Sequence, residues 1–349
     1  MLETAFERVS LPLAHEFTIA RDTRTAAENA VVRITDESGT TGVGAAAPAT
    51  RYGETPATVD AILPELLAVV ERAGDPHARQ RIERERDEVV RDNPAAHAAV
   101  DVALADLAAK RLGVPLFRQL GLDPDAAPRT SFTIGLDATE RMREKAADAV
   151  AAGHDVLKVK LGTDRDEAIA AAVRAAAPDA RLRVDANEAW TPREAVRRIE
   201  ALAAYDVEFV EQPVPAADPA GLRHVAARSP LPLAADESCV RLTDVPQVAE
   251  WADVANVKLM KCGGVGPARR MLHAARAHGL ETMLGCMIES DAAIAAACHL
   301  TPLVDYADLD GSLLLDADPY AGVPIDGDGI HLAALDDEGL AGTGARRRE

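Results

Sequence analysis

Lysine is rare in this chain, and the positions of its lysines suggest chemistry. Only 6 lysines occur against 32 arginines, and four of them fall in two short motifs, Lys158-Val159-Lys160 and Lys258-Leu259-Met260-Lys261. Arginine cannot lose its proton in a protein, whereas a lysine amine can act as a base when its pKa falls toward the working pH. The clustered lysines are therefore candidates for proton transfer.

Three acidic motifs lie between the two lysine motifs, at intervals typical of one strand, loop and helix. The successive intervals from Lys160 through the three acids to Lys258 are 25, 26, 25 and 22 residues. Carboxylates at the ends of neighbouring strands form an all-oxygen site that suits a hard divalent cation, and magnesium is the natural candidate. One such acid alone is more often a solvated loop residue, but three at matched spacing favour a metal site. The predicted ligands are Asp185, Glu211 and Asp236.

A divalent cation with a base on each side suits the removal of a proton from the carbon next to a carboxylate. This reaction adds a second negative charge to the carboxylate, and a fixed cation stabilises that charge most in the transition state. Bases on opposite faces can remove the proton from one side and return it from the other, which inverts the configuration. Strand alternation places Lys158 and Lys160 together and Lys258 across the three acids. Lys261 lies past the strand end at an odd offset, and we expect it to be peripheral.

The motifs require a fold whose successive strands point the same way. After residue 128, strand-like runs alternate with helical patterns, which favours a parallel β/α barrel over an open sheet. Active sites of such barrels lie at the carboxyl ends of the strands, where every motif above falls. The expected strands lie near 130–135, 155–160, 182–186, 207–211, 232–236, 254–259, 281–285 and 304–308.

The first part of the chain predicts a separate α+β domain. Residues 1 to about 47 have strand character, and helical patterns cover 58–73 and 94–112, the second with Asn93 as its expected N-cap. The C-terminal residues are rich in Gly, Asp and Pro, and we expect them to return to the first domain. The predicted units are a capping domain at 1–125, a catalytic barrel at 126–316 and a C-terminal segment at 317–349.

The net charge of -19 argues against nucleic acid and anionic membranes as partners. Acid excess, abundant Ala and few aromatic residues are typical of proteins from salt-loving organisms, in which high salt screens the repulsion. A GC-rich genome is the alternative explanation. No run of about 18 apolar residues and no basic-then-apolar leader is present, so neither a membrane span nor a signal peptide is indicated. The four cysteines lack C-x-x-C spacing, and a reducing cytoplasm is the expected compartment.

The lysine and acid motifs resemble those of the enolase superfamily, most closely the muconate-lactonizing-enzyme subgroup. Residues 99–121 are also similar to the helix and loop that close the subgroup's N-terminal domain. The resemblance implies a modified TIM barrel, that is a (β/α) barrel, with an N-terminal α+β capping domain completed by the C-terminal tail. It further implies one Mg²⁺ per subunit and a homo-oligomer. It makes Lys160 and Lys258 the opposing acid/base pair and Lys158 a partner of the substrate carboxyl group.

The motif Asp308-Leu309-Asp310 resembles the Asp-x-Asp of the dipeptide epimerases, whose two carboxylates bind the ammonium group of the substrate. A solvated loop and a second metal site are the alternatives for such a motif. Residues 285–290 are similar to the segment that lines the peptide group of the substrate, with Cys286 where relatives often have Ser. A first-strand threonine near the same pocket is also shared, although packing explains a lone strand Thr equally well. These similarities add Thr133, Cys286 and Ile288 to the substrate-binding candidates.

An early loop differs from the relatives that act on alanyl-glutamate. Those enzymes bind the side-chain carboxylate of the substrate with an arginine, and Asp22 stands at that place here, flanked by Arg21 and Arg24. Taken literally, this change favours a cationic or polar substrate side chain over an acidic one. Asp22 and Arg24 are therefore substrate-binding candidates, and 51–54 is expected to form a second mobile loop over the pocket.

Residue chemistry and resemblance together predict a magnesium-dependent dipeptide epimerase. It would remove and return the α-proton of the C-terminal residue of an L,L-dipeptide through an enediolate, a 1,1-proton transfer. Another subgroup enzyme is the alternative: a cycloisomerase, an o-succinylbenzoate synthase or an N-acylamino acid racemase. The substrates of these enzymes present no free ammonium for Asp308 and Asp310. A barrel that binds metal or ligand without turnover is the least favoured reading, because the lysines and ligands are all present.

Overall fold

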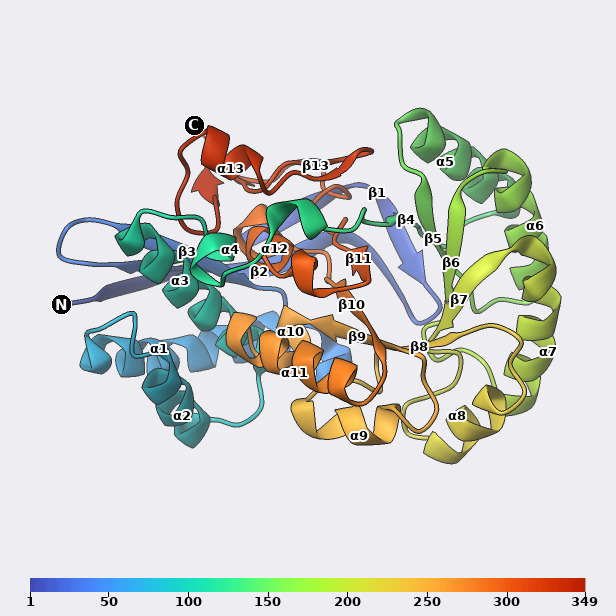
Figure 1. The fold of residues 1–349 in the computed structure, drawn as a ribbon, viewed down its shortest axis with the longest axis horizontal. Helices are drawn as coiled ribbons and strands as arrows, with labels where there is room; N and C mark the ends of the chain where they lie inside the picture. The colour runs from blue at the N-terminus through green and yellow to red at the C-terminus, as the bar shows by residue number, and fades with distance from the viewer. Residues whose placement is uncertain (349) are drawn as a thin grey trace.

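The structure is a computed structural model and describes residues 1–348. Figure 1 shows two parts side by side, an N-terminal sheet with helices and a strand-and-helix barrel, with both chain ends on the side of the N-terminal part. In that part β1 (Glu3–Ile19), β2 (Asp22–Thr35) and β3 (Thr41–Ala46) form an antiparallel sheet in that order. The long β1–β2 hairpin reaches from the capping domain to the barrel.

Two helices cover this sheet, α1 (Pro56–Ala73) and α3 (Pro94–Leu112), and α2 (Arg79–Val89) packs against both of them. The alanine-rich α3 lies directly on β3, and two glycines make the close approach possible. A Cβ atom on Gly42 would lie 2.2 Å from the Ala103 carbonyl oxygen, and one on Gly44 would lie 2.3 Å from that of Ala99. Only glycine fits at such backbone distances.

Asn93 occupies the predicted N-cap position of α3, but it does not cap the helix with its side chain. That side chain makes no capping hydrogen bond, and the Asn93 backbone is left-handed with φ of 67°. The buried carboxylate of Glu54 accepts hydrogen bonds from the backbone amides of Ala95 and Ala96 instead. A residue from a distant loop thus caps the helix, and local sequence rules do not reveal such a partner.

The predicted barrel is confirmed. Eight parallel strands pair in chain order, and a bridge between Thr130 and Ala307 links the first strand region to the last. The chain order and the parallel direction are those of a β/α barrel. The strands are β4 (Phe132–Ile134), β5 (Val156–Lys160), β6 (Arg181–Asp185), β7 (Val207–Glu211), β8 (Leu233–Ala235), β9 (Val254–Lys258), β10 (Glu281–Gly285) and β11 (Tyr306–Asp308).

Helices between the strands cover the outside of the barrel, and short helices lie at the junctions with the capping domain. Those of the barrel are α5 (Thr139–Ala151), α6 (Asp166–Ala176), α7 (Pro192–Leu202), α8 (Pro219–Ala226), α9 (Val245–Val248), α10 (Leu259–Cys262), α11 (Val265–Ala277) and α12 (Asp291–Cys298). The others are α4 (Leu116–Gln119) and α13 (Ala334–Asp337). The described helices include none that is long and apolar enough to cross a bilayer.

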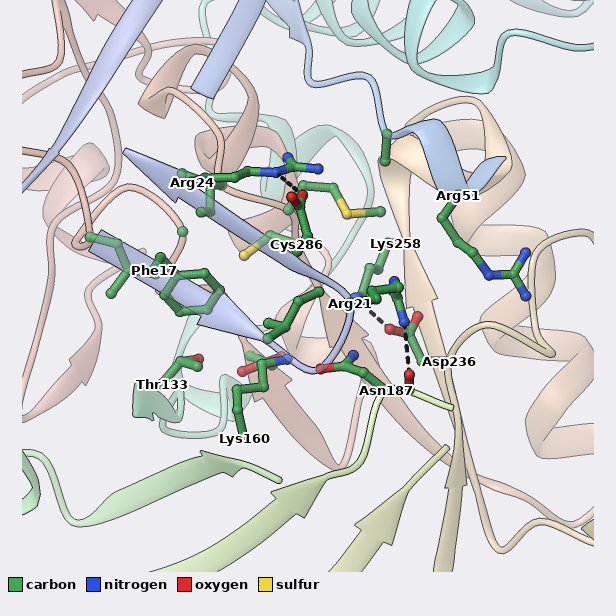
Figure 2. Close-up of a pocket in the computed structure, with 18 of the residues that line it drawn as sticks. Phe17, Arg21, Arg24, Arg51, Thr133, Lys160, Asn187, Asp236, Lys258 and Cys286 are labelled. Carbon is green, nitrogen blue, oxygen red and sulfur yellow. Dashed lines mark hydrogen bonds and ion pairs between the residues drawn. The ribbon is translucent and has the colours of Figure 1, made fainter. Parts of the chain in front are cut away.

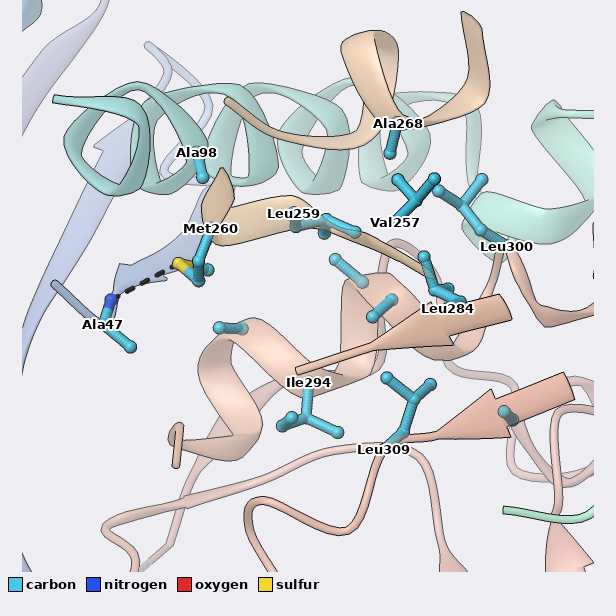
Figure 3. Packing of buried hydrophobic residues seen from close by; sticks show 14 of the residues in the cluster. Ala47, Ala98, Val257, Leu259, Met260, Ala268, Leu284, Ile294, Leu300 and Leu309 are labelled. Atoms are coloured by element: carbon cyan, nitrogen blue, oxygen red, sulfur yellow. Dashed lines mark hydrogen bonds between the residues drawn. The ribbon is translucent and has the colours of Figure 1, made fainter. Parts of the chain in front are cut away.

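An apolar contact joins the barrel to the capping domain. Figure 3 shows Met260 of α10 next to Ala98 of α3, with Leu259 of α10 and Ala268 of α11 further along the same contact, and all four side chains are buried. The Ala47 amide also donates to the Met260 sulfur at 3.3 Å. The two parts therefore share one continuous core, which fixes the capping domain over the barrel.

The C-terminal segment lies against the capping domain. Its strand β12 (Tyr320–Ala321) pairs with β15 (Arg346–Arg347), and β13 (Ile325–Asp326) pairs with β14 (Gly329–Ile330). The backbone amide and hydroxyl of Thr343 both donate to Asp106 of α3. These contacts agree with the expected return of this segment, while the exact domain boundaries at 125 and 316 stay predictions.

Candidate active site

The strand register brings the predicted residues to one level at the mouth of the barrel. Lys160 pairs with Asp185, Asp185 with Glu211, and on the other side Lys258 pairs with Gly285 and Gly285 with Asp308. Parallel strands in register present their carboxyl ends together, which is why motifs far apart in sequence meet here.

A cavity of about 400 Å³ lies between this mouth and the β1–β2 hairpin (Figure 2). Its size is in the range of small-molecule sites. Its walls come from the strand ends, from the hairpin and from the loop after β3. Among the predicted site residues it is lined by Asp22, Arg24, Thr133, Lys158, Lys160, Asp236, Lys258, Cys286, Ile288, Asp308 and Asp310. Asp185 and Glu211 lie buried beneath it.

The three predicted metal ligands form one cluster. Asp185, Glu211 and Asp236 each offer an oxygen atom, and these atoms all lie within 4.8 Å of one another. All three side chains are buried, and Asn256 donates to Glu211 Oε1 at 2.8 Å, which orients that carboxylate. Glu211 Oε2 accepts no hydrogen bond of good geometry, although Lys158 Nζ is 2.7 Å away. Buried, converging carboxylate oxygens with a lone pair to spare fit a hard divalent cation such as Mg²⁺.

Three lysine amines surround the acidic cluster. Lys160 Nζ is 2.7 Å from Asp185 Oδ2, and Lys258 Nζ is 2.7 Å from Asp236 Oδ2. Lys158 Nζ lies deeper, 3.3 Å from Asp185 Oδ2 and 2.8 Å from Asp308 Oδ2. The two lysines predicted as bases therefore contact different acids of the cluster, one on β6 and the other after β8.

The electrostatics of the cluster are strongly coupled. Burial raises the pKa of Glu211 to about 7, and the neighbouring Asp185 and Asp236 add to the rise, while Lys158 opposes it. Burial also acts to raise the pKa of Asp185, but the attraction of Lys160 and Lys158 outweighs burial and lowers this pKa to about 2. Burial disfavours the charged form of Lys258, yet Asp236 outweighs it and raises the pKa of that amine. Three acids at this spacing repel one another, so added positive charge is favourable at their centre.

The prediction that Lys261 is peripheral was wrong. Its amine is buried and donates to Asp236 Oδ1 at 2.5 Å, to the Asp236 carbonyl oxygen at 2.6 Å and to the Asn256 carbonyl oxygen at 2.9 Å. The strand ends at Lys258 and the chain turns at once into α10, so strand alternation no longer decides where Lys261 points. This lysine holds Asp236 from the side opposite Lys258.

The two acids of the Asp-x-Asp motif both line the cavity, next to the first barrel strand. Asp308 accepts a short hydrogen bond from Ser131 Oγ, and Asp310 Oδ2 accepts one from the Thr133 amide at 2.6 Å. Burial and the adjacent Asp308 raise the pKa of Asp310 to about 6. Two buried carboxylates that repel each other favour a cation between them.

Two family models match the chain. Residues 1–121 match the mandelate racemase / muconate lactonizing enzyme N-terminal domain, and residues 141–343 match the enolase C-terminal domain-like family. The chain belongs to the mandelate racemase/muconate lactonizing enzyme family. This membership confirms the predicted resemblance and the predicted fold class.

Known members of this family resemble the chain over almost its full length. An L-Ala-D/L-amino acid epimerase of Pedosphaera parvula is 41% identical over 330 residues, covering 92% of this chain and 93% of that protein. An L-Ala-D/L-Glu epimerase of Bacteroides thetaiotaomicron is 38% identical, covering 93% and 84%. The crystal structure of a dipeptide epimerase of Enterococcus faecalis with Mg and L-Leu-L-Tyr has a TM-score of 0.91 at 34% identity, and covers 99% of both chains.

Three apolar cavity residues, Phe17, Ile19 and Leu314, were not expected from the sequence. Together with Tyr52 and Met287, which lie in the two segments expected near the pocket, they give the cavity an apolar side. Phe17 and Ile19 lie two residues apart on β1, so strand alternation could have placed their side chains on one face. Nothing in the sequence indicates that the β1–β2 hairpin reaches the mouth of the barrel.

The loop predicted to be mobile over the pocket is tied down in this structure. Arg51 lies in a short 3₁₀ turn (Thr50–Tyr52) and donates to both carboxylate oxygens of Glu188, each at 2.6 Å. Glu188 follows β6, so the ion pair links the capping domain to the barrel mouth. A bidentate pair of this kind restricts the loop.

Proposed function

We propose that this protein is a magnesium-dependent dipeptide epimerase that inverts the α-carbon of the C-terminal residue of an L,L-dipeptide. One observation carries the proposal: two lysines on different acids of a buried carboxylate cluster share a cavity with a paired Asp-x-Asp. The first half of this arrangement suits proton transfer next to a carboxylate, and the second suits an ammonium group. The names of the relatives, dipeptide epimerases of several kinds, agree with it.

The acidic cluster and Lys158 would receive the carboxylate end of the substrate. Asp185, Glu211 and Asp236 would hold Mg²⁺, which when bound supplies positive charge to the negative charge that develops on the substrate carboxylate. Lys158 adds a fixed ammonium that three acids keep in place, since its amine lies within 3.3 Å of oxygen atoms of Asp185, Glu211 and Asp308. Burial of these groups excludes water and strengthens the electrostatic stabilisation of the enediolate.

Lys160 and Lys258 would exchange the α-proton. A cation held by the three acids would offset the attraction of Asp236 that otherwise raises the pKa of Lys258. In its neutral form one amine would then take the proton from the substrate α-carbon, and the ammonium of the other would give a proton to the opposite face of the enediolate. Each lysine contacts a carboxylate of the cluster, which holds the amine at a fixed place before the substrate arrives. Because either lysine can act first, the reaction runs in both directions.

Asp308 and Asp310 would bind the free ammonium of the N-terminal residue. The rival reactions of the family use substrates without this ammonium, and the buried Asp310 carboxylate, which unlike Asp308 has no lysine in contact, would then lack a cationic partner, which costs affinity. This difference favours a dipeptide over a muconate, a succinylbenzoate precursor or an N-acyl amino acid.

Proton exchange tests the proposal directly. In deuterated buffer with Mg²⁺, L-Ala-L-Xaa dipeptides should gain one deuterium at the α-carbon of Xaa and convert to the L,D form, as followed by mass spectrometry and chiral chromatography. Wild-type protein treated with EDTA serves as the control and should show neither change. A complete lack of exchange over a dipeptide library would refute the proposed function.

The variant Asp310→Asn separates the dipeptide reaction from its rivals. It should lower kcat/KM for a dipeptide by about 10- to 100-fold, because a charge-assisted hydrogen bond is lost. Mg²⁺ affinity, measured by calorimetry, should stay unchanged, since Asp310 is not in the acidic cluster. Unchanged dipeptide turnover would exclude ammonium binding by this residue.

We infer that the protein works in the cytoplasm, as a homo-oligomer, and in a salt-rich cell. Four free cysteines support a reducing compartment, and the net charge of -19 supports high salt. Analogy with related barrels supports the oligomer. Light scattering at high salt would test the oligomer, and a monomer over the full concentration range would refute it.

A further inference from the structure

The tip of the β1–β2 hairpin forms a fixed wall of the cavity. A Cβ atom on Gly135 would lie 3.1 Å from the Phe17 ring, and one on Gly162 would lie 2.8 Å from the Ala20 Cβ. The Leu136 amide also donates to the Thr18 carbonyl oxygen at 2.8 Å. The hairpin tip thus rests on the loops after β4 and β5, so its side chains face a substrate from set positions.

Every arginine that lines the cavity already has a carboxylate partner. Arg21 Nη2 lies 2.7 Å from Glu237 Oε1, and its Nη1 donates to the Asn187 carbonyl oxygen. Arg51 is held by both oxygens of Glu188, as described above. Arg24 Nε donates to Asp22 Oδ2 at 2.6 Å, and Figure 2 shows Arg24 on the side of the cavity away from Lys160 and Thr133. The arginines therefore leave no free positive charge for a substrate side chain.

The remaining wall next to these pairs is apolar. The residues that supply it are Phe17, Ile19, Met287, Ile288 and Leu314. Lysines and acids occupy the barrel side of the cavity, where they would hold both charged ends of a dipeptide. The side chain of its C-terminal residue would then face the rest of the cavity lining, which is this apolar wall, formed by β1 and by the loops after β10 and β11, together with the Asp22–Arg24 pair.

We propose that this protein epimerises dipeptides whose C-terminal side chain is apolar, and that the Asp22–Arg24 pair discriminates against acidic side chains. This inference rests on the proposed function and adds the substrate class. An apolar side chain gains from contact with the apolar wall, whereas a carboxylate there loses water and meets Asp22 before any free cation. A cationic side chain meets Arg24 in the same way.

Substrates of equal length provide the test. We expect kcat/KM to be highest for L-Ala-L-Met, lower for L-Ala-L-Gln, and lowest for L-Ala-L-Glu and L-Ala-L-Lys. The value for L-Ala-L-Met should exceed that for L-Ala-L-Glu by roughly 100-fold. Exchange with an order led by L-Ala-L-Glu or L-Ala-L-Lys would overturn the inference and leave the proposed function intact. If none of these dipeptides, nor any other, exchanges its α-proton, the proposed function itself fails.

The variant Asp22→Asn tests the role of the pair. It keeps the shape but frees the charge of Arg24, so the ratio of kcat/KM for Glu over Met should rise about tenfold. The double variant Asp22→Asn/Arg24→Gln should lose this gain, which assigns it to the guanidinium. An unchanged ratio in Asp22→Asn would refute the assignment.

A matched control comes from an ion pair away from the cavity. Arg129 and Asp155 are 2.8 Å apart, with side chains 44% and 48% exposed, close to the 37% and 42% of Arg24 and Asp22. The variant Asp155→Asn removes one surface carboxylate without touching the cavity. In this variant the ratio of kcat/KM for L-Ala-L-Glu over L-Ala-L-Met should equal that of the wild type. A rise in this ratio as large as that in Asp22→Asn would show that net charge, and not the Asp22–Arg24 pair, causes the effect.

Discussion

Lys261 contributes more to the predicted metal centre than its position after the strand end suggests. Its buried amine binds a carboxylate oxygen and the carbonyl oxygen of Asp236, and so fixes the position of one predicted Mg²⁺ ligand. Lys258 donates to the other carboxylate oxygen of Asp236. Of two lysines three residues apart, one faces the cavity and the other supports the ligand from behind.

Replacing Lys261 should therefore destabilise the protein. The variant Lys261→Met leaves the buried Asp236 with one cation fewer, and we expect the free energy of unfolding to fall by about 3 kcal/mol. Urea denaturation in EDTA at constant high salt measures it. The control variant Lys145→Met breaks a surface ion pair with Asp137, whose side chain is 41% exposed. It should lower the free energy of unfolding by less than about 1 kcal/mol. Equal losses in the two variants would return Lys261 to the peripheral role expected from sequence.

The residue types of the site could be predicted, but their partners could not. Rare lysines and evenly spaced acids indicate a metal-assisted proton transfer because few other arrangements need them. The neutralisation of Arg24 by Asp22 and of Arg21 by Glu237 depends on side-chain positions that no spacing rule contains. The catalytic and binding roles given to these residues stay predictions.

At the scale of elements, a buried histidine joins the barrel to the capping domain. His299, at the end of α12, accepts a hydrogen bond from the Phe117 amide of α4 at 2.9 Å and stacks on the Phe117 ring. Burial lowers the pKa of His299 from its ordinary 6.5 to about 4. The unfolded chain therefore binds this proton more readily than the folded one.

This contact should contribute to acid sensitivity. The stabilisation by neutral His299 is complete above pH 6.5 and is lost as pH falls from 6.5 toward 4. Between pH 7 and pH 5 the loss from this group amounts to about 2 kcal/mol. We expect His299→Gln to be less stable than wild type at pH 7 but to lose less stability by pH 5, as measured by urea denaturation. Parallel pH profiles for both proteins would contradict this assignment.

The bounds of helices and strands could be predicted from the sequence where an element is buried along its length. The run 207–211 was predicted with the bounds of β7, and α3 was predicted with both of its ends, because apolar strand runs and a Pro-to-Gly helix are strong local signals. The Glu54 cap of α3 and the Thr130–Ala307 closure of the barrel come from residues far apart in sequence. Such contacts depend on the complete fold.

For the whole molecule, the acidic surface predicts a dependence on salt. With a net charge of -19, self-repulsion is strong when the Debye length is about 10 Å, at 0.1 M salt, and weak when it is about 3 Å, at 1 M. We expect Tm to rise by roughly 5 °C or more over this range.

Calorimetry in NaCl measures this effect, with sucrose as a control for excluded-solute stabilisation. Sucrose of equal osmolality should raise Tm less than NaCl does. A Tm that ignores NaCl would favour genome composition as the origin of the acidic surface.

The central claim is that Lys160 and Lys258 serve opposite faces of one α-carbon, and stereospecific exchange tests it most directly. Lys160→Ala and Lys258→Ala should each lower epimerisation by about 10²- to 10⁴-fold. In deuterated buffer one variant should still exchange the α-proton of the L,L-dipeptide with retention, and the other only that of the L,D-dipeptide. If both variants exchange the same isomer, or if either still epimerises at the wild-type rate, the two-base account is wrong.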